Sequence, residues 1–187
     1  MSTSTNKNLP TIPNNIDWNG LFISDFDETI LKLDIAWNEW REKLKVKKIS
    51  DLWNQPNSQE LWQLLLEAEV QAADRGDFIP HTIDFLEKTQ AFAVLTNNGE
   101  PAVERALSRI PQLKEKCLII VGRETLGGPK QERKNFTAGF NKCLDVLPLS
   151  KKDSRVYYLG DQNYELEFAQ SLKAEPICVN KNGLEFR

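Results

Sequence analysis

Short, largely apolar runs recur along the chain and alternate with amphipathic stretches. The runs cover residues 21–26, 91–95, 117–121, 155–159 and 176–179. Apolar runs of this length, bounded by glycine and polar residues, predict strands that are buried on both faces, as in a parallel sheet. Strands that alternate with helices predict an α/β fold, and 187 residues are enough for a single domain with a full core.

The amphipathic stretches predict helices after the strands, over about residues 80–90, 101–109, 131–147 and 164–173. Two further helices, over about 33–44 and 58–75, interrupt the alternation between the first and second strands. Residues 32–79 are therefore expected to form a helical insert, which contains four of the five tryptophans. Packing of the helix pair and contact with a substrate are both open interpretations of these tryptophans.

Composition and charge narrow the function classes. The chain has 24 basic and 27 acidic residues, and a net charge of −3 argues against a general nucleic-acid binder. No apolar run approaches the roughly 20 residues needed to cross a bilayer, so we expect no membrane partner. Residues 1–19 are expected to be a flexible leader without the apolar core of a secretory signal, and three cysteines without a C-x-x-C pair indicate reduced thiols. We therefore expect a cytoplasmic protein, a monomer or a weak homodimer.

Polar side chains that could serve in catalysis or ligand binding follow four of the predicted strands. In chain order they are Asp25 and Asp27, then Thr96 and Asn97, then Lys130, then Asp161 and Glu165. The carboxyl ends of parallel strands lie at one edge of a sheet, where ligands of α/β proteins bind. Acids that emerge from a buried strand need a positive partner, and Mg²⁺ prefers oxygen ligands such as carboxylates and phosphates. The residues alone therefore predict a magnesium and anion site.

The same residues resemble the motifs of the haloacid dehalogenase (HAD) superfamily. The sequence DFDET at residues 25–29 resembles its aspartyl-nucleophile motif, and Thr96 resembles the hydroxyl of its second motif. Lys130, six residues before Phe136, resembles the third motif without its two prolines. GDQNYE at residues 160–165 resembles the fourth motif, with glutamate in place of the last aspartate, and Glu28 replaces a usual glycine.

This resemblance implies a three-layer, Rossmann-like core built from residues 20–31 and 80–187, with residues 32–79 as a helical cap. It implies a phosphatase in which Asp25 attacks phosphorus and Asp27 serves as acid and then base. Its implied Mg²⁺ ligands are Asp25, the backbone carbonyl of Asp27, Asp161 and Glu165. Thr96, Asn97 and Lys130 would hold the phosphoryl oxygens of a small phosphorylated substrate.

Two other functions keep the same residues. A phosphotransferase or phosphomutase would differ only in the group that accepts the phosphoryl, and a non-catalytic HAD-like module would bind a partner through the tryptophan-rich insert. Candidate substrate contacts in the insert are Trp37, Trp40, Arg41 and Lys43. His81, the only histidine, has no acidic or cysteine neighbours and is expected to be structural.

Overall fold

A six-stranded sheet forms the centre of the protein. The computed structural model describes residues 15–147 and 154–187, so most of the predicted leader lies outside the described residues. The strands run in the order β5 (Cys117–Val121), β4 (Phe92–Leu95), β1 (Leu21–Ser24), β6 (Val156–Gly160), β7 (Glu175–Asn180) and β8 (Gly183–Phe186). The first five are parallel, and only β8 is antiparallel to its neighbour. The predicted parallel sheet is confirmed.

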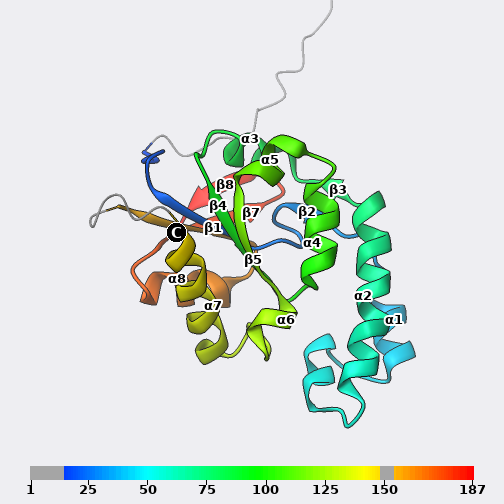
Figure 1. Cartoon of the computed structure of the whole chain (residues 1–187). Coiled ribbons are helices and arrows are strands. Elements are labelled where there is room, and N and C mark those ends of the chain that lie inside the picture. Colours follow the sequence, from blue (N-terminus) through cyan, green and yellow to red (C-terminus); the bar gives the residue numbers. More distant parts are fainter. Residues whose placement is uncertain (1–14, 148–153) are drawn as a thin grey trace, which may run out of the picture.

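Helices cover both faces of this sheet. Figure 1 shows α7 (Arg133–Val146) and α8 (Asn163–Ser171) on one side, with α3 (Pro80–Leu86), α4 (Glu100–Leu107) and α5 (Pro111–Lys116) on the other. Alternate side chains of β1 enter the two cores: Phe22 packs with the α3–α5 side, whereas Leu21 and Ile23 pack with the α7–α8 side. This burial on both faces explains why β1 is apolar throughout, and it gives the expected three-layer α/β fold.

The insert after β1 begins and ends in a small antiparallel ribbon. Strand β2 (Leu31–Lys32) pairs with β3 (Asp77–Phe78), and α1 (Trp37–Leu44), the 3₁₀ helix η1 (Ile49–Asn54) and α2 (Ser58–Arg75) lie between them. Leu44, Leu52 and Leu65 form a small apolar cluster of the insert. Ala72 and Ala73, near the other end of α2, pack instead into the main core. The insert therefore has an apolar cluster of its own and also rests on the core through α2.

Besides η1, two short helices were not predicted. The helix α5 begins at Pro111, and α6 (Arg123–Leu126) begins two residues after the end of β5. Each spans fewer than two turns, and such a segment has too few positions to show a 3.6-residue period.

The three cysteines form no disulfide in the structure, in agreement with the reduced thiols expected from the sequence. Cys117, Cys143 and Cys178 are free thiols, and burial raises the pKa of Cys117 and of Cys143 to about 12. These two thiols therefore stay protonated and pack as small apolar groups. None of the helices in the described part of the chain is both long and apolar enough to cross a membrane.

Candidate active site

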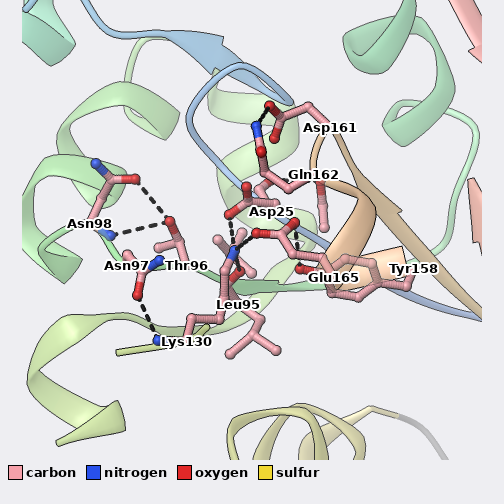
Figure 2. Close-up of polar contacts among 12 residues, drawn as sticks. Asp25, Leu95, Thr96, Asn97, Asn98, Lys130, Tyr158, Asp161, Gln162 and Glu165 are labelled. Atoms are coloured by element: carbon pink, nitrogen blue, oxygen red, sulfur yellow. Dashed lines mark hydrogen bonds and ion pairs between the residues drawn. The ribbon is translucent and has the colours of Figure 1, made fainter. Parts of the chain in front are cut away.

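The ends of β1 and β6, neighbours in the sheet, bring acids and a lysine together. Asp25 follows β1, Asp161 follows β6, and Glu165 lies in the first turn of α8. The Lys130 ammonium lies 2.5 Å from an Asp25 carboxylate oxygen and 2.7 Å from a Glu165 oxygen, and it donates to the Leu95 carbonyl at 3.1 Å. Figure 2 shows the Asp25 and Glu165 side chains meeting the Lys130 ammonium, with Asp161 farther away beside Gln162. We call Asp25, Lys130, Asp161 and Glu165 the strand-end cluster.

The strand-end cluster has more negative than positive groups. One oxygen each from Asp25, Asp161 and Glu165 lies within 4.8 Å of the others, and Lys130 is the cation among them. Burial and the Asp25 charge raise the pKa of Asp161 to about 6 and that of Glu165 to about 7. Burial lowers the pKa of Lys130, but Asp25 and Glu165 outweigh it, so the net shift is upward. Three converging carboxylate oxygens and this charge balance fit Mg²⁺.

Asp27 lies beside the cluster and faces the start of the insert. One of its carboxylate oxygens accepts a hydrogen bond from the Leu33 backbone N–H at 3.0 Å. Its pKa is raised to about 7, chiefly by burial, with contributions from nearby Asp25, Glu28 and Asp161. A carboxyl group that titrates near neutral pH can both donate and accept a proton, as a general acid and base must.

The loop after β4 supplies hydroxyl and amide groups. The Thr96 hydroxyl donates to the Asn98 side-chain oxygen at 2.9 Å and accepts from the Asn98 backbone N–H at 3.2 Å. The Asn97 side-chain oxygen accepts from the Lys130 backbone N–H at 2.8 Å (Figure 2). Asn97 therefore joins the β4 loop to the loop that presents Lys130.

Two tyrosines hold Glu165, which is almost fully buried. Tyr164 donates its hydroxyl to one carboxylate oxygen at 2.9 Å, and Tyr158 donates to the other at 3.3 Å. The carboxylate also approaches the backbone closely, because a Cβ at Gly160 would lie 2.6 Å from a Glu165 oxygen. Glycine at position 160 thus leaves the room that a glutamate needs where the resembling motif has aspartate.

A second buried ion pair joins the insert to the core. Glu69 of α2 accepts two hydrogen bonds from the Arg123 guanidinium, at 2.7 and 3.0 Å. The same carboxylate accepts from the Gly99 backbone N–H at 3.1 Å and from the Asn98 side chain at 3.3 Å. The guanidinium carbon also lies 4.5 Å from the centre of the Trp62 ring. We call Glu69 and Arg123 the insert–core pair.

Both ion pairs line one cavity of about 280 Å³. All of the sequence-predicted site residues line it: Asp25, Asp27, Thr96, Asn97, Lys130, Asp161 and Glu165. Of the four candidate substrate contacts in the insert, only Trp37 does so. Trp40, Arg41 and Lys43 lie outside the lining, and the Lys43 ammonium instead covers the Trp40 ring at 4.2 Å. The interpretation of these three as substrate contacts is wrong.

Several lining residues were not singled out from the sequence: Trp53, Trp62, Glu69, Asn98, Arg123, Gln162 and Tyr164. Glu69 did carry a signal, because it lies four residues after Leu65 and three before Ala72, on the apolar side of α2. An acid on an apolar helix face indicates a buried partner. Arg123 carried no such signal, since it stands in a polar loop after a strand.

Glu28 adopts a backbone conformation that favours glycine. Its φ is +58°, in the left-handed region, which costs most side chains roughly 1–2 kcal/mol. The side chain is exposed, lies 4.0 Å from the Lys32 ammonium and contributes to the cavity lining. Glycine, which the resembling motif has at this position, adopts this backbone without that cost. Glu28 therefore departs from the motif at a position where the backbone favours glycine.

Comparisons with known proteins identify the fold. No family model matches the chain, and no curated protein sequence matches it. Among solved structures, CbbY from Rhodobacter sphaeroides in complex with phosphate superposes with a TM-score of 0.59 and 17% identity over 84% of each chain. A HAD phosphatase from Thermococcus onnurineus gives 0.54 and 18%, covering 88% of this chain and 87% of that one.

A third similar structure is the HAD-hydrolase YfnB from Bacillus subtilis bound to magnesium. It superposes with a TM-score of 0.56 and 14% identity, covering 84% of this chain and 87% of that one. Each of the three superpositions covers at least 84% of both chains, and at these identities it shows the fold alone. The chain therefore has the fold of the haloacid dehalogenase superfamily, as its strand-end motifs predicted.

Proposed function

We propose that the protein is a Mg²⁺-dependent phosphatase that works through an aspartyl-phosphate on Asp25. One observation carries the proposal: Asp25 and Glu165 both contact Lys130, and an Asp161 oxygen lies within 4.8 Å of theirs, in a cavity that also contains Asp27 and Thr96. Asp25, Asp161, Glu165 and the backbone carbonyl of Asp27 would hold Mg²⁺. Bound there, Mg²⁺ neutralises charge on the phosphoryl group and helps to align it for in-line attack.

Each residue then has one task. An Asp25 oxygen forms a bond to phosphorus as the bond from phosphorus to the leaving oxygen breaks, and Asp27 gives its proton to that oxygen. Asp27, now a carboxylate, takes a proton from water, whose oxygen attacks phosphorus and frees Asp25 and inorganic phosphate. Thr96 contacts the phosphoryl oxygens, with Asn97 holding the loop of Lys130. The Lys130 ammonium has three N–H bonds and three acceptors, which are Asp25, Glu165 and the Leu95 carbonyl. Its first task is therefore to orient Asp25 and Glu165.

The similar structures support this assignment in general terms. CbbY is described in complex with phosphate, and YfnB is described as bound to magnesium. A dehalogenase also has this fold, with a TM-score of 0.53 and 15% identity. Asp27 favours ester chemistry, because displacement of a halide needs no proton donor, whereas a departing alkoxide does. The cytoplasmic location and the monomeric or weakly dimeric state stay predictions.

The decisive experiment measures release of phosphate from an aryl phosphate with and without Mg²⁺. We expect turnover by the wild type with Mg²⁺, and a fall in kcat of roughly 10³-fold or more in Asp25→Asn, because the amide cannot attack phosphorus. Asp145→Asn, a change of the same kind at an exposed site on α7, is the matched control and should keep full activity. Equal rates for Asp25→Asn and the wild type would refute the proposal.

Two further measurements separate the alternatives. Product analysis with added alcohols distinguishes transfer to water from transfer to a hydroxyl, which defines a phosphotransferase. Fluoroberyllate with Mg²⁺ mimics a phosphorylated aspartate, so it should raise the melting temperature of the wild type and leave Asp25→Asn unchanged. A non-catalytic module has no need of an aligned Asp25 and would show no such stabilisation.

A further inference from the structure

The part of the cavity that faces the insert is aromatic. Its lining from the insert includes Trp37, Trp53 and Trp62, together with Ile49. The Trp53 and Trp62 rings lie 5.1 Å apart between centroids, at 54° to each other. A volume of about 280 Å³ is near the lower end of the roughly 300–1,000 Å³ of small-molecule sites. The cavity therefore suits a phosphate and one compact leaving group.

Packing alone accounts for some of the tryptophans. Trp37, Trp40 and Trp62 contact the apolar cluster formed by Leu44, Leu52 and Leu65. Trp53 is not among the described residues that contact this cluster. It lines the cavity, and its side chain is only partly buried. An aromatic side chain that faces a cavity without serving the apolar cluster beside it is available for a ligand.

The cations of the cavity are already paired. Among the lining residues in the described part of the chain, two are cationic and six are acidic. Lys130 contacts Asp25 and Glu165, and Arg123 contacts both oxygens of Glu69. Both cations are at least 95% buried. A second anionic group on a substrate would therefore meet carboxylates without a free cation to offset them.

A cationic leaving group is also disfavoured. Tryptophans with nearby acids can bind quaternary ammonium groups through their ring faces. Here the Trp62 ring already carries the Arg123 guanidinium at 4.5 Å, and Trp62 lies against Trp53. The Trp62 ring is therefore already occupied by a cation and offers no free face to a second one.

We propose that the leaving group of the substrate is an uncharged alcohol with a flat, apolar ring that packs on Trp53. This inference rests on the proposed phosphatase function and specifies its substrate class. Esters whose alcohol carries a carboxylate or a second phosphate are disfavoured by the carboxylates that line the cavity, and an ammonium group is disfavoured because Arg123 already occupies the Trp62 ring. The alcohol leaves with the proton of Asp27, and phosphate remains as the second product.

The test compares four phosphate esters of alcohols with Mg²⁺: benzyl phosphate, 4-carboxybenzyl phosphate, ethyl phosphate and phosphocholine. Because the leaving oxygens are all those of primary alcohols, differences in kcat/KM chiefly report how the rest of the leaving group binds. We expect kcat/KM for benzyl phosphate to exceed that for ethyl phosphate by about tenfold, from one or two aromatic contacts. The carboxylate should lower the value again by about tenfold. A value for 4-carboxybenzyl phosphate or phosphocholine at or above that for benzyl phosphate would overturn the inference.

Variants of two tryptophans locate the effect. Trp53→Leu should raise KM for benzyl phosphate by roughly fivefold or more and leave KM for ethyl phosphate nearly unchanged. Trp40→Leu removes a tryptophan of the same insert that lies outside the cavity lining, so both values should stay at the wild-type level. Equal effects of the two changes on benzyl phosphate would contradict the assignment of Trp53.

A binding measurement separates the two proposals. Calorimetry with benzylphosphonate and ethylphosphonate, which are not hydrolysed, should give tighter binding of the benzyl compound by about tenfold. Hydrolysis of ethyl phosphate that depends on Asp25, without any preference for the ring, would refute the substrate class and leave the phosphatase function standing. If none of the esters is hydrolysed and neither phosphonate binds, the phosphatase function itself fails.

Discussion

The two buried ion pairs of the cavity differ in their charge balance. In the strand-end cluster, Lys130 faces the carboxylates of Asp25 and Glu165, and Asp161 lies within reach of both. In the insert–core pair, Arg123 faces Glu69 alone, and donors of the β4 loop complete the carboxylate's hydrogen bonds. The first arrangement has negative charge to spare for a metal ion, whereas the second is neutral and closed.

This difference separates a site built for chemistry from one that holds the fold together. Buried carboxylates that outnumber their cation raise their own pKa values, and such shifts are typical of functional sites. A one-to-one pair with bidentate geometry orients two elements instead, here α2 of the insert and the start of α6. We therefore expect loss of a partner to lower stability most in the insert–core pair. We expect pH and metal to change stability mainly through the strand-end cluster.

The largest effect on stability should come from breaking the insert–core pair. In Arg123→Met, Glu69 would remain buried without its cation, and removing one partner of a buried pair costs about 3–5 kcal/mol. Unfolding in urea should show a fall of this size in the free energy of unfolding. The double variant Arg123→Met with Glu69→Gln should recover much of the loss, because a neutral amide can still accept from Gly99. A double variant no more stable than Arg123→Met would contradict the account.

The strand-end cluster should make stability depend on pH when metal is removed. The pKa values of Asp161 and Glu165 are raised to about 6 and 7 in the folded protein. Acids with a raised folded pKa stabilise the fold fully below about pH 4, and that contribution is lost as the pH rises through 6 and 7. In EDTA, this cluster should therefore lower the free energy of unfolding between pH 5 and 7.5, by up to about 1.4 kcal/mol per pH unit for each group.

Two controls isolate this dependence from that of other carboxylates. Glu165→Gln removes one of the titrating groups, so its unfolding free energy should change less steeply than that of the wild type over the same range. Mg²⁺ binds the ionised acids of the folded state, so it should restore stability above pH 7 in the wild type. Parallel pH curves for the two proteins in EDTA would count against an excess of carboxylates in the cluster.

The core and most of the site were predictable from the sequence because they rest on local patterns. The runs at residues 117–121 and 155–159 became β5 and β6 to within one residue, since strands buried on both faces are apolar throughout. The helix expected over 58–75 has those bounds. The convergence of Asp25, Lys130 and Glu165 followed from strand ends meeting at one edge of a parallel sheet.

The parts that the sequence did not reveal depend on contacts between distant segments. Glu69 and Arg123 are 54 positions apart, and no local period links them. Which tryptophans face the cavity depends on how η1 turns the insert, and a single 3₁₀ helix leaves little trace in hydrophobic spacing. Trp40, a candidate substrate contact from the sequence, thus packs on the insert cluster, whereas Trp53, which the sequence did not single out, lines the cavity.

The smallest effect on stability should come from an exposed ion pair that also joins α2 to the core. Arg105 of α4 donates to both carboxylate oxygens of Asp74, at 2.6 and 3.2 Å, and both side chains are largely in solvent. Like the insert–core pair it is bidentate, but it is exposed, whereas the Glu69 carboxylate is buried and has further donors in Asn98 and Gly99. In Arg105→Gln, the Asp74 carboxylate and the new amide both stay hydrated. Urea unfolding should therefore show a loss of unfolding free energy far below that of Arg123→Met. Added salt should abolish the remaining difference from the wild type, because exposed charges are screened. A loss as large as that of Arg123→Met would mean that the α2–core contact as a whole, and not burial of the Glu69 charge, sets the stability of the insert.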